Sequence, residues 1–271
     1  MIWIGLFLAA LCRSTVVFLI PAFLVMELLV NNRNEWYKSF FRYLFTYAFP
    51  LLAGLAVFVW YQYYETGVWF AYFKQQSSNW GHKLAMPVLP FGDFEGHRLI
   101  WLNAMAMFTA LIALIILIRK GFLWLSRNII EPNRILSLSL SYLVVTMCFI
   151  IFFNPTWTDG GRTMSAGMHR YTLATPFFFA FLADKLKQET NYKLRNFIGV
   201  FVLANIVWLA FGSYIHIQQW LLFNVNFLLI LLYMLYASKR YLWASIAIAA
   251  FNIMVQHQLF QIFISRVTSA D

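Results

Sequence analysis

Long, uninterrupted apolar runs constrain this chain more than any other feature of its sequence. The runs are about 20 residues long, which is the length a helix needs to cross the hydrocarbon core of a bilayer. In lipid, each spanning backbone must satisfy its own hydrogen bonds, so only helices or a closed barrel can cross. A barrel would need apolar and polar residues to alternate, and they do not. The sequence therefore predicts an all-α, polytopic transmembrane helical bundle.

The composition excludes a soluble globular protein. Hydrophobic residues make up 62% of the 271 residues and charged residues only 11%, whereas soluble domains carry about 25% charged residues. We therefore expect residues 1–271 to form a single transmembrane domain whose main partner is the lipid bilayer. Cys12 and Cys148 lie inside apolar runs and are expected to act as small buried residues.

About eight membrane segments can be delimited along the chain. They cover residues 1–30, 43–64, 99–118, 135–153, 171–183, 197–212, 220–237 and 242–264. The first is interrupted by Arg13-Ser14-Thr15 and Pro21, so a kinked span and two half-helices both fit it. The fifth is short for a spanning helix and contains Pro176.

The net charge of +10 does not indicate a nucleic-acid partner, because the basic residues flank the apolar runs. Most of them fall in one alternate set of loops, which the positive-inside rule places in the cytoplasm. The loops 65–98 and 154–170 are then periplasmic or lumenal. This topology predicts an integral protein of a bacterial inner membrane or of the endoplasmic reticulum, with its functional loops on the outer side.

Arg13 is the first candidate for chemistry. An arginine within an apolar run costs about 2.5–3.5 kcal/mol on insertion scales, so it usually pairs or faces a cavity. Two roles fit its position equally well. Arg13 could bind a phosphate or carboxylate, or it could lie at a helix break with its side chain extending to the membrane interface. Ser14 and Thr15 follow directly and could cap a half-helix, and a capped helix N-terminus beside an arginine suits an anion.

Two further segments lie in the predicted outer loops. Gln76, Asn79, Trp80 and His82 offer amide and indole groups suited to a sugar, although the aromatic residues around them also fit a short helix lying in the membrane interface. Later, Asp159 and Arg162 lie in a glycine-rich loop.

His169 and Arg170 lie at the mouth of the fifth segment, where adjacent cationic groups would suit a lipid phosphate. The alternative is a positive flank to a hydrophobic helix, but on this topology the pair lies on the side that normally avoids positive charge, which favours the functional interpretation. No phosphate-cradling loop and no metal-ligand spacing is present in the sequence.

Together, in this order, these segments resemble the GPI mannosyltransferase 2 (PIG-V) family of GT-C glycosyltransferases and its bacterial relatives, over residues 4–183. The matching positions are Arg13-Ser14-Thr15, then Thr66-Gly67, Phe73, Gln76, Asn79, Trp80 and Gly81, then His169-Arg170-Tyr171 and Pro176.

The resemblance implies a mannosyltransferase-like enzyme that transfers a sugar from a polyprenyl-phosphate donor to an acceptor. By this resemblance Arg13, His169, Arg170 and Tyr171 would bind the lipid phosphate. The sugar or acceptor would be bound by Gln76, Asn79, Trp80, His82 and Arg162.

One feature of the family is missing. GT-C enzymes carry an essential acidic residue in the first outer loop, after helices that precede the arginine-serine segment. This chain begins almost at that segment, so we expect the C-terminal part of a longer architecture or a shortened relative. Asp159 and Asp93 are weak substitutes for the missing catalytic acid. A partner subunit could also supply it. No cofactor is identified, and a divalent metal remains compatible with such a transfer.

Two alternatives stay open from the sequence. A transporter or flippase for a lipid-linked or anionic substrate would explain Arg13 and the broken first segment. A non-catalytic membrane subunit would explain the missing N-terminal part.

Overall fold

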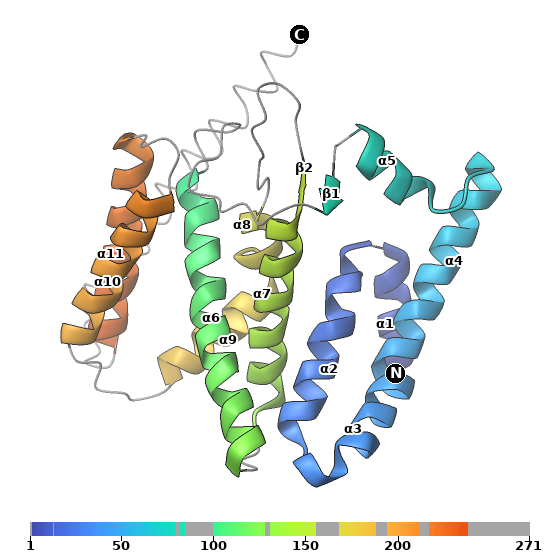
Figure 1. Ribbon diagram of the computed structural model, residues 1–271, viewed down its shortest axis with the longest axis horizontal. Coiled ribbons are helices and arrows are strands. Elements are labelled where there is room, and N and C mark those ends of the chain that lie inside the picture. The colour runs from blue at the N-terminus through green and yellow to red at the C-terminus, as the bar shows by residue number, and fades with distance from the viewer. Residues whose placement is uncertain are drawn as a thin grey trace.

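The structure, a computed structural model, describes residues 2–12, 14–79, 82–84, 100–127, 131–155, 168–187, 194–211 and 217–237. Nearly all of them lie in helices that run side by side as a bundle (Figure 1). This confirms the predicted helical class. The exception is one pair of three-residue strands, β1 (His82–Leu84) and β2 (Phe153–Pro155), at one end of the bundle.

The first apolar region forms two helices rather than one kinked span. α1 covers Ile2–Cys12, the 3-10 turn η1 covers Ser14–Phe18, and α2 covers Leu19–Val30. In Figure 1 the chain reverses direction between the upper ends of α1 and α2, and α1 packs against α4 (Phe49–Thr66). Pro21 is tolerated because it lies in the first turn of α2, where the backbone N–H would have no partner within the helix.

The second region is a long continuous helical rod. It starts with the 3-10 turn η2 (Arg33–Glu35), α3 (Trp36–Tyr43) and the π turn η3 (Leu44–Ala48), and it ends with α4 (Phe49–Thr66). Pro50 has no N–H to donate and its ring opposes a regular α-helical bond to the preceding turn. The π turn lies directly before it and lets the rod continue. Gly67 ends the rod with φ of 68° and donates its N–H to the carbonyl of Tyr63 at 2.8 Å, a conformation that glycine adopts without strain.

The remaining helices follow the predicted runs with some changes. They are α5 (Ala71–Asn79), α6 (Ile100–Arg127), α7 (Arg134–Phe152), α8 (Met168–Thr172), α9 (Pro176–Lys187), α10 (Leu194–Phe211) and α11 (Ile217–Ala237). Asn133 caps α7, since its side chain accepts the N–H of Leu136 at 3.0 Å. The predicted fifth segment is divided between α8 and α9, with the break just before Pro176. The predicted eighth segment, 242–264, lies outside the described residues.

Three stretches of the described chain are long and apolar enough to cross a bilayer. They are Arg33–Thr66, Trp101–Ser126 and Arg134–Phe152. Shorter apolar helices occur at Ile2–Cys12, Thr15–Val30, Ile198–Ala210 and Trp220–Leu229. By length and composition, the three long helices are those of a membrane protein.

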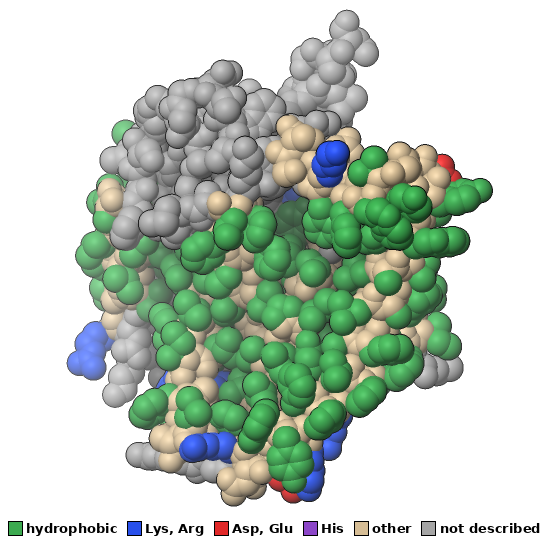
Figure 2. Space-filling model, turned by 45° about the vertical axis from the view of Figure 1, so that its right-hand side comes forward, with side chains coloured by type: hydrophobic (Ala, Val, Ile, Leu, Met, Phe, Trp, Pro, Cys, Tyr) green, Lys and Arg blue, Asp and Glu red, His purple; other side chains and the backbone are tan. Residues whose placement is uncertain are grey.

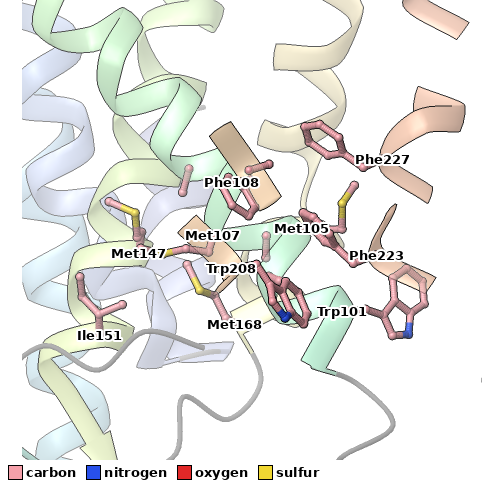
Figure 3. Close-up of a cluster of buried hydrophobic side chains, with 14 residues drawn as sticks. Trp101, Met105, Met107, Phe108, Met147, Ile151, Met168, Trp208, Phe223 and Phe227 are labelled. Carbon is pink, nitrogen blue, oxygen red and sulfur yellow. The ribbon is translucent and has the colours of Figure 1, made fainter. Parts of the chain in front are cut away.

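The buried side chains form two main clusters, one on each side of α7. The larger joins α6, α7, α8, α10 and α11, and the side chains of Met107, Met147, Met168, Trp208 and Phe223 meet in it (Figure 3). The smaller joins α1, α2 and the α3–α4 rod around Phe23, Met26 and Leu51. α7 packs against α2 on one side and against α6 and α9 on others.

The outer surface of the bundle is apolar over a wide area. Figure 2 shows hydrophobic side chains covering most of the visible middle of the molecule. The side chains of Trp60, Ile115 and Phe122 are more than half exposed. An apolar surface this extensive is unfavourable in water and is the normal surface of a helical bundle in lipid.

The contact between α1 and α4 depends on a glycine. A Cβ atom on Gly54 would lie 2.6 Å from the backbone oxygen of Phe7 and 2.7 Å from the Cβ of Ala10. Small residues allow helices in membranes to approach this closely, and the resulting packing holds them together.

We therefore expect Gly54→Ala to destabilise the protein by about 1–3 kcal/mol, because α1 must move away from α4. The thermal unfolding of the purified protein in detergent measures this change. Gly5→Ala is the matched control, since nothing lies within 4 Å of a Cβ there and alanine favours a helix interior by up to about 1 kcal/mol. Equal melting temperatures for both variants would contradict the close packing.

Candidate functional site

The structure describes some of the predicted site residues and not others. His169, Arg170 and Tyr171 lie in α8, which is described in full. The backbones of Gln76 and Asn79 lie in α5 and that of His82 in β1. The predicted residues outside the described ranges are Arg13, Trp80, Asp93, Asp159 and Arg162.

The strand pair joins the two predicted outer loops. β1 and β2 are antiparallel, with His82 opposite Pro155, Lys83 opposite Asn154 and Leu84 opposite Phe153. β1 belongs to the loop 65–98 and β2 enters the loop 154–170, which are separated by two long helices in the sequence. Figure 1 shows that α5, β1, β2 and α8 lie toward the same end of the bundle, which we call the β1–β2 end.

Helix α8 packs into the core through Met168, and two threonine hydroxyls bond to its backbone carbonyls. Met168 is fully buried in the larger core cluster. The hydroxyl of Thr172 donates to the carbonyl of Met168 at 2.8 Å, and that of Thr175 donates to the carbonyl of Thr172 at 2.7 Å. Both bonds lie within or just after α8, before Pro176 begins α9. Arg170, by contrast, is exposed.

His169 is held by a buried asparagine that the sequence analysis did not single out. Asn103, on α6, is 5% exposed. Its Oδ1 atom accepts the backbone N–H of His169 at 3.3 Å and lies 2.8 Å from Nδ1 of the His169 ring. Because an amide oxygen only accepts hydrogen bonds, Nδ1 must carry a hydrogen. The other ring nitrogen, Nε2, is then an acceptor whenever the ring is neutral.

Burial makes the ring of His169 neutral at ordinary pH. Loss of solvation, followed by the charge of Arg170, lowers the pKa of His169 from 6.5 to about 4. The positive charge of the predicted His169-Arg170 pair is therefore carried by Arg170. His169 instead offers Nε2 as a hydrogen-bond acceptor, a role that suits a hydroxyl group.

A chain of aromatic rings links α8 to the other two predicted segments. Tyr171 meets Phe18 edge-on at 6.4 Å between ring centroids, Phe18 lies 4.9 Å from Phe149, and Phe149 stacks on Phe153 at 5.2 Å. Phe18 ends η1, the turn that begins at Ser14, and Phe153 pairs with Leu84 in the strand ladder. The elements η1, β1–β2 and α8, which contain or adjoin the three segments of the family resemblance, therefore lie around the upper end of α7.

Helix α5 folds back over the end of the α3–α4 rod. The rings of Tyr63 and Trp69 stack at 4.3 Å, and the backbone N–H of Tyr72 donates to the side-chain oxygen of Gln62 at 3.3 Å. Trp69, Phe70 and Phe73 are exposed. Exposed aromatic rings beside the end of a spanning helix are typical of the membrane interface, as the simpler interpretation of this segment predicts.

Of the site residues that the sequence analysis did not single out, only one could have been recognised from the sequence. Asn103 is a polar residue within an otherwise apolar predicted span, and such residues usually face a partner inside the bundle. Phe18 and Phe149 are two phenylalanines among 29, so nothing in the sequence distinguishes them.

Within the described ranges, no group of three or more histidine, cysteine or acidic side chains is close enough together to hold a metal ion. The acids Asp93 and Asp159 lie outside those ranges. Whether a divalent metal takes part therefore stays an open prediction from the sequence.

Comparison with family models, with curated proteins and with solved structures finds no significant match to this chain. The similarity to the GPI mannosyltransferase 2 family remains a prediction from the three segments.

The lowered pKa of His169 predicts a dependence of stability on pH. Between about pH 6.5 and pH 4 the unfolded chain binds a proton at this residue and the folded chain does not. The free energy of unfolding should therefore fall as the pH is lowered through this range, and should show no contribution from His169 above it.

Melting temperatures of the wild type and His169→Gln, measured in detergent at several pH values from 7 to 4, check this prediction. Glutamine can still donate to Asn103 but does not titrate. The wild type should lose more stability on acidification than the variant. If the melting temperatures of the two proteins fall equally with pH, His169 has the same pKa in the folded and unfolded chains and the prediction is wrong.

Proposed function

We propose that this chain is a multi-pass membrane glycosyltransferase of the GT-C type. It would transfer a sugar, mannose by the family resemblance, from a polyprenyl-phosphate donor to an acceptor at the β1–β2 end. The observation that carries the proposal is the meeting of η1, β1–β2 and α8 around the upper end of α7. These segments contain or adjoin the three motifs of the resemblance, and nothing in their sequence separation requires them to meet.

The side chains at this end suit the parts of such a reaction. The exposed guanidinium of Arg170 would bind the phosphate that leaves with the lipid, and a fixed cation stabilises the charge that develops there. The neutral ring of His169 would accept a hydrogen bond from a sugar or acceptor hydroxyl. Rotation of that ring is restricted because Asn103 holds its other nitrogen.

The surroundings of the site suit a lipid substrate. Trp69, Phe70 and Phe73 expose their rings beside the end of α4, at the depth where lipid head groups would lie if the rod spans the bilayer. A lipid-linked donor could then keep its chain in the membrane while its phosphate reaches α8. Eight membrane segments, and a periplasmic or lumenal position for the β1–β2 end, are part of this proposal.

The proposal does not assign the role of catalytic acid to any of the described residues. Asp93 or Asp159 could act as the base that activates the acceptor hydroxyl. A preceding segment of a longer chain, or a partner subunit, could supply it instead.

Sugar transfer by membranes that contain the full chain tests the proposal. The assay supplies polyprenyl-phosphate mannose labelled in the sugar and measures the label transferred to endogenous acceptors. Arg170→Ala should lower transfer at least tenfold, because a cation that stabilises a leaving group typically contributes about 10²–10³ in rate. The amount of the Arg170→Ala variant in the membrane and its melting temperature should match those of the wild type, since the side chain of Arg170 is exposed.

Arg195→Ala is the matched control, because Arg195 is also an exposed arginine near a helix end and is predicted to lie on the opposite side of the membrane. Transfer that is equal in both variants, or absent from the wild type, would remove the proposal. Movement of the labelled lipid across the membrane without transfer would instead favour the transporter alternative. Loss of assembly with another protein in the Arg170→Ala variant would favour the subunit alternative.

A further inference from the structure

The opposite end of the bundle contains a fully buried acidic side chain. Glu27, on α2, has no exposed side-chain surface. Its Oε2 atom accepts a hydrogen bond from Nδ2 of Asn31 at 2.9 Å, and its Oε1 atom lies 3.4 Å from the hydroxyl of Tyr47 in the π turn. Tyr47 is fixed by stacking on Phe23 at 4.4 Å. A buried carboxylate costs several kcal/mol unless opposite charges lie nearby.

Two arginines from different helices supply those charges. Nη1 of Arg42, on α3, lies 3.9 Å from Oε2 of Glu27, and Nη1 of Arg134, at the start of α7, lies 3.9 Å from Oε1. Both distances are longer than a hydrogen bond. The carboxylate therefore attracts both guanidinium groups without binding their N–H groups. At this position one carboxylate thus faces two guanidinium groups.

The outer parts of the two arginines remain accessible. Their side chains are 49% and 50% exposed, and both lie beside the same carboxylate, so one phosphate-bearing head group could reach both. Arg42 makes one further contact, a hydrogen bond from Nη1 to Oδ1 of Asn31 at 3.3 Å. Most of the five N–H groups of each guanidinium are thus available to an anion.

The neighbouring surface indicates a lipid rather than a dissolved anion. Phe41 and Phe45, next to Arg42 along the rod, are 56% and 58% exposed. Figure 2 shows lysine and arginine side chains at the lower end of the molecule, directly below the broad hydrophobic surface. An anion held here would have its charged part at the arginines and apolar side chains beside it, which matches a phospholipid whose acyl chains run along the rod.

We propose that Arg42 and Arg134 bind the phosphate of an anionic phospholipid head group at this end of the bundle, with Glu27 holding the two guanidinium groups in position. Basic pockets between membrane helices commonly bind such head groups, and the planar guanidinium suits phosphate oxygens. This site shares no residue with the β1–β2 end, so it does not depend on the proposed sugar transfer.

A purely structural role for the two arginines is the competing explanation, since they also compensate the charge of Glu27. That role predicts that replacing either arginine lowers stability but leaves lipid selectivity unchanged. Lipid selectivity is therefore the quantity to measure.

Native mass spectrometry of the full chain in a non-ionic detergent measures it directly. The protein is titrated with phosphatidylglycerol, which is anionic, and with phosphatidylcholine, which has no net charge. The wild type should retain phosphatidylglycerol in preference. Arg42→Gln and Arg134→Gln should each weaken that retention on the order of tenfold, the value of one charged hydrogen bond. Retention of phosphatidylcholine should not change.

Lys38→Gln is the matched control. Lys38 lies on the same helix as Arg42, but its ammonium group is paired with Glu35 at 2.8 Å. Phosphatidylglycerol retention that falls equally in the control and in the arginine variants would overturn the proposal, as would arginine variants that bind like the wild type.

Two additional measurements keep the test decisive if an arginine variant fails to fold. Arg42→Lys and Arg134→Lys keep the charge beside Glu27 but lose the planar group, and they should still retain less phosphatidylglycerol than the wild type. Inorganic phosphate should not displace the lipid; displacement at equal concentration would identify a site for free anions and overturn the lipid assignment.

Discussion

The packing of neighbouring helices against α7 is the interaction on which the rest of the described bundle depends. Leu140 and Leu143 on this helix are completely buried, and α2, α6 and α9 all pack along it. Its small polar residues Ser137 and Ser141 are buried as well, and the hydroxyl of Ser141 donates to the carbonyl of Ser137 at 2.7 Å. Because small side chains let helices approach closely in lipid, α7 can serve as a common neighbour for both halves of the chain.

The two ends of α7 carry different chemistry as a result. At one end Phe149 and Phe153 continue into the strand pair and the aromatic contacts of Phe18 and Tyr171. At the other, Arg134 turns toward the buried Glu27. Each proposed site thus combines α7 with segments that are remote in the sequence. A lipid-linked substrate at one end and a head group at the other would both contact a bundle whose middle is apolar.

The behaviour of His169 illustrates how tertiary contacts change the chemistry of a motif. From the sequence, His169 and Arg170 are two adjacent cations suited to a phosphate. In the structure Asn103 holds one ring nitrogen and burial lowers the pKa of the ring to about 4, so only Arg170 is charged at neutral pH. A pair of like residues in sequence becomes one acceptor and one cation, which is a more useful combination for a substrate with both hydroxyl and phosphate groups.

The sequence by itself determined the helical class, the apolar surface and the approximate limits of most helices. These are local properties: a run of apolar residues must satisfy its own backbone hydrogen bonds, and Asn133, Gly67 and Pro176 mark helix ends through their own geometry. The sequence also pointed to α8 as a candidate site, because on the predicted topology its histidine and arginine lie on the side that normally avoids positive charge.

Only the tertiary structure decided which of these elements meet. The packing of α1 against α4, the contact of His169 with Asn103 and the position of Arg42 and Arg134 around Glu27 each join residues well separated in the sequence. Such pairs depend on which helix surfaces pack together, and that choice follows from the shapes of many side chains at once. No single run or motif contains that information, so the partners of a polar residue inside the bundle become known only when the helices are placed.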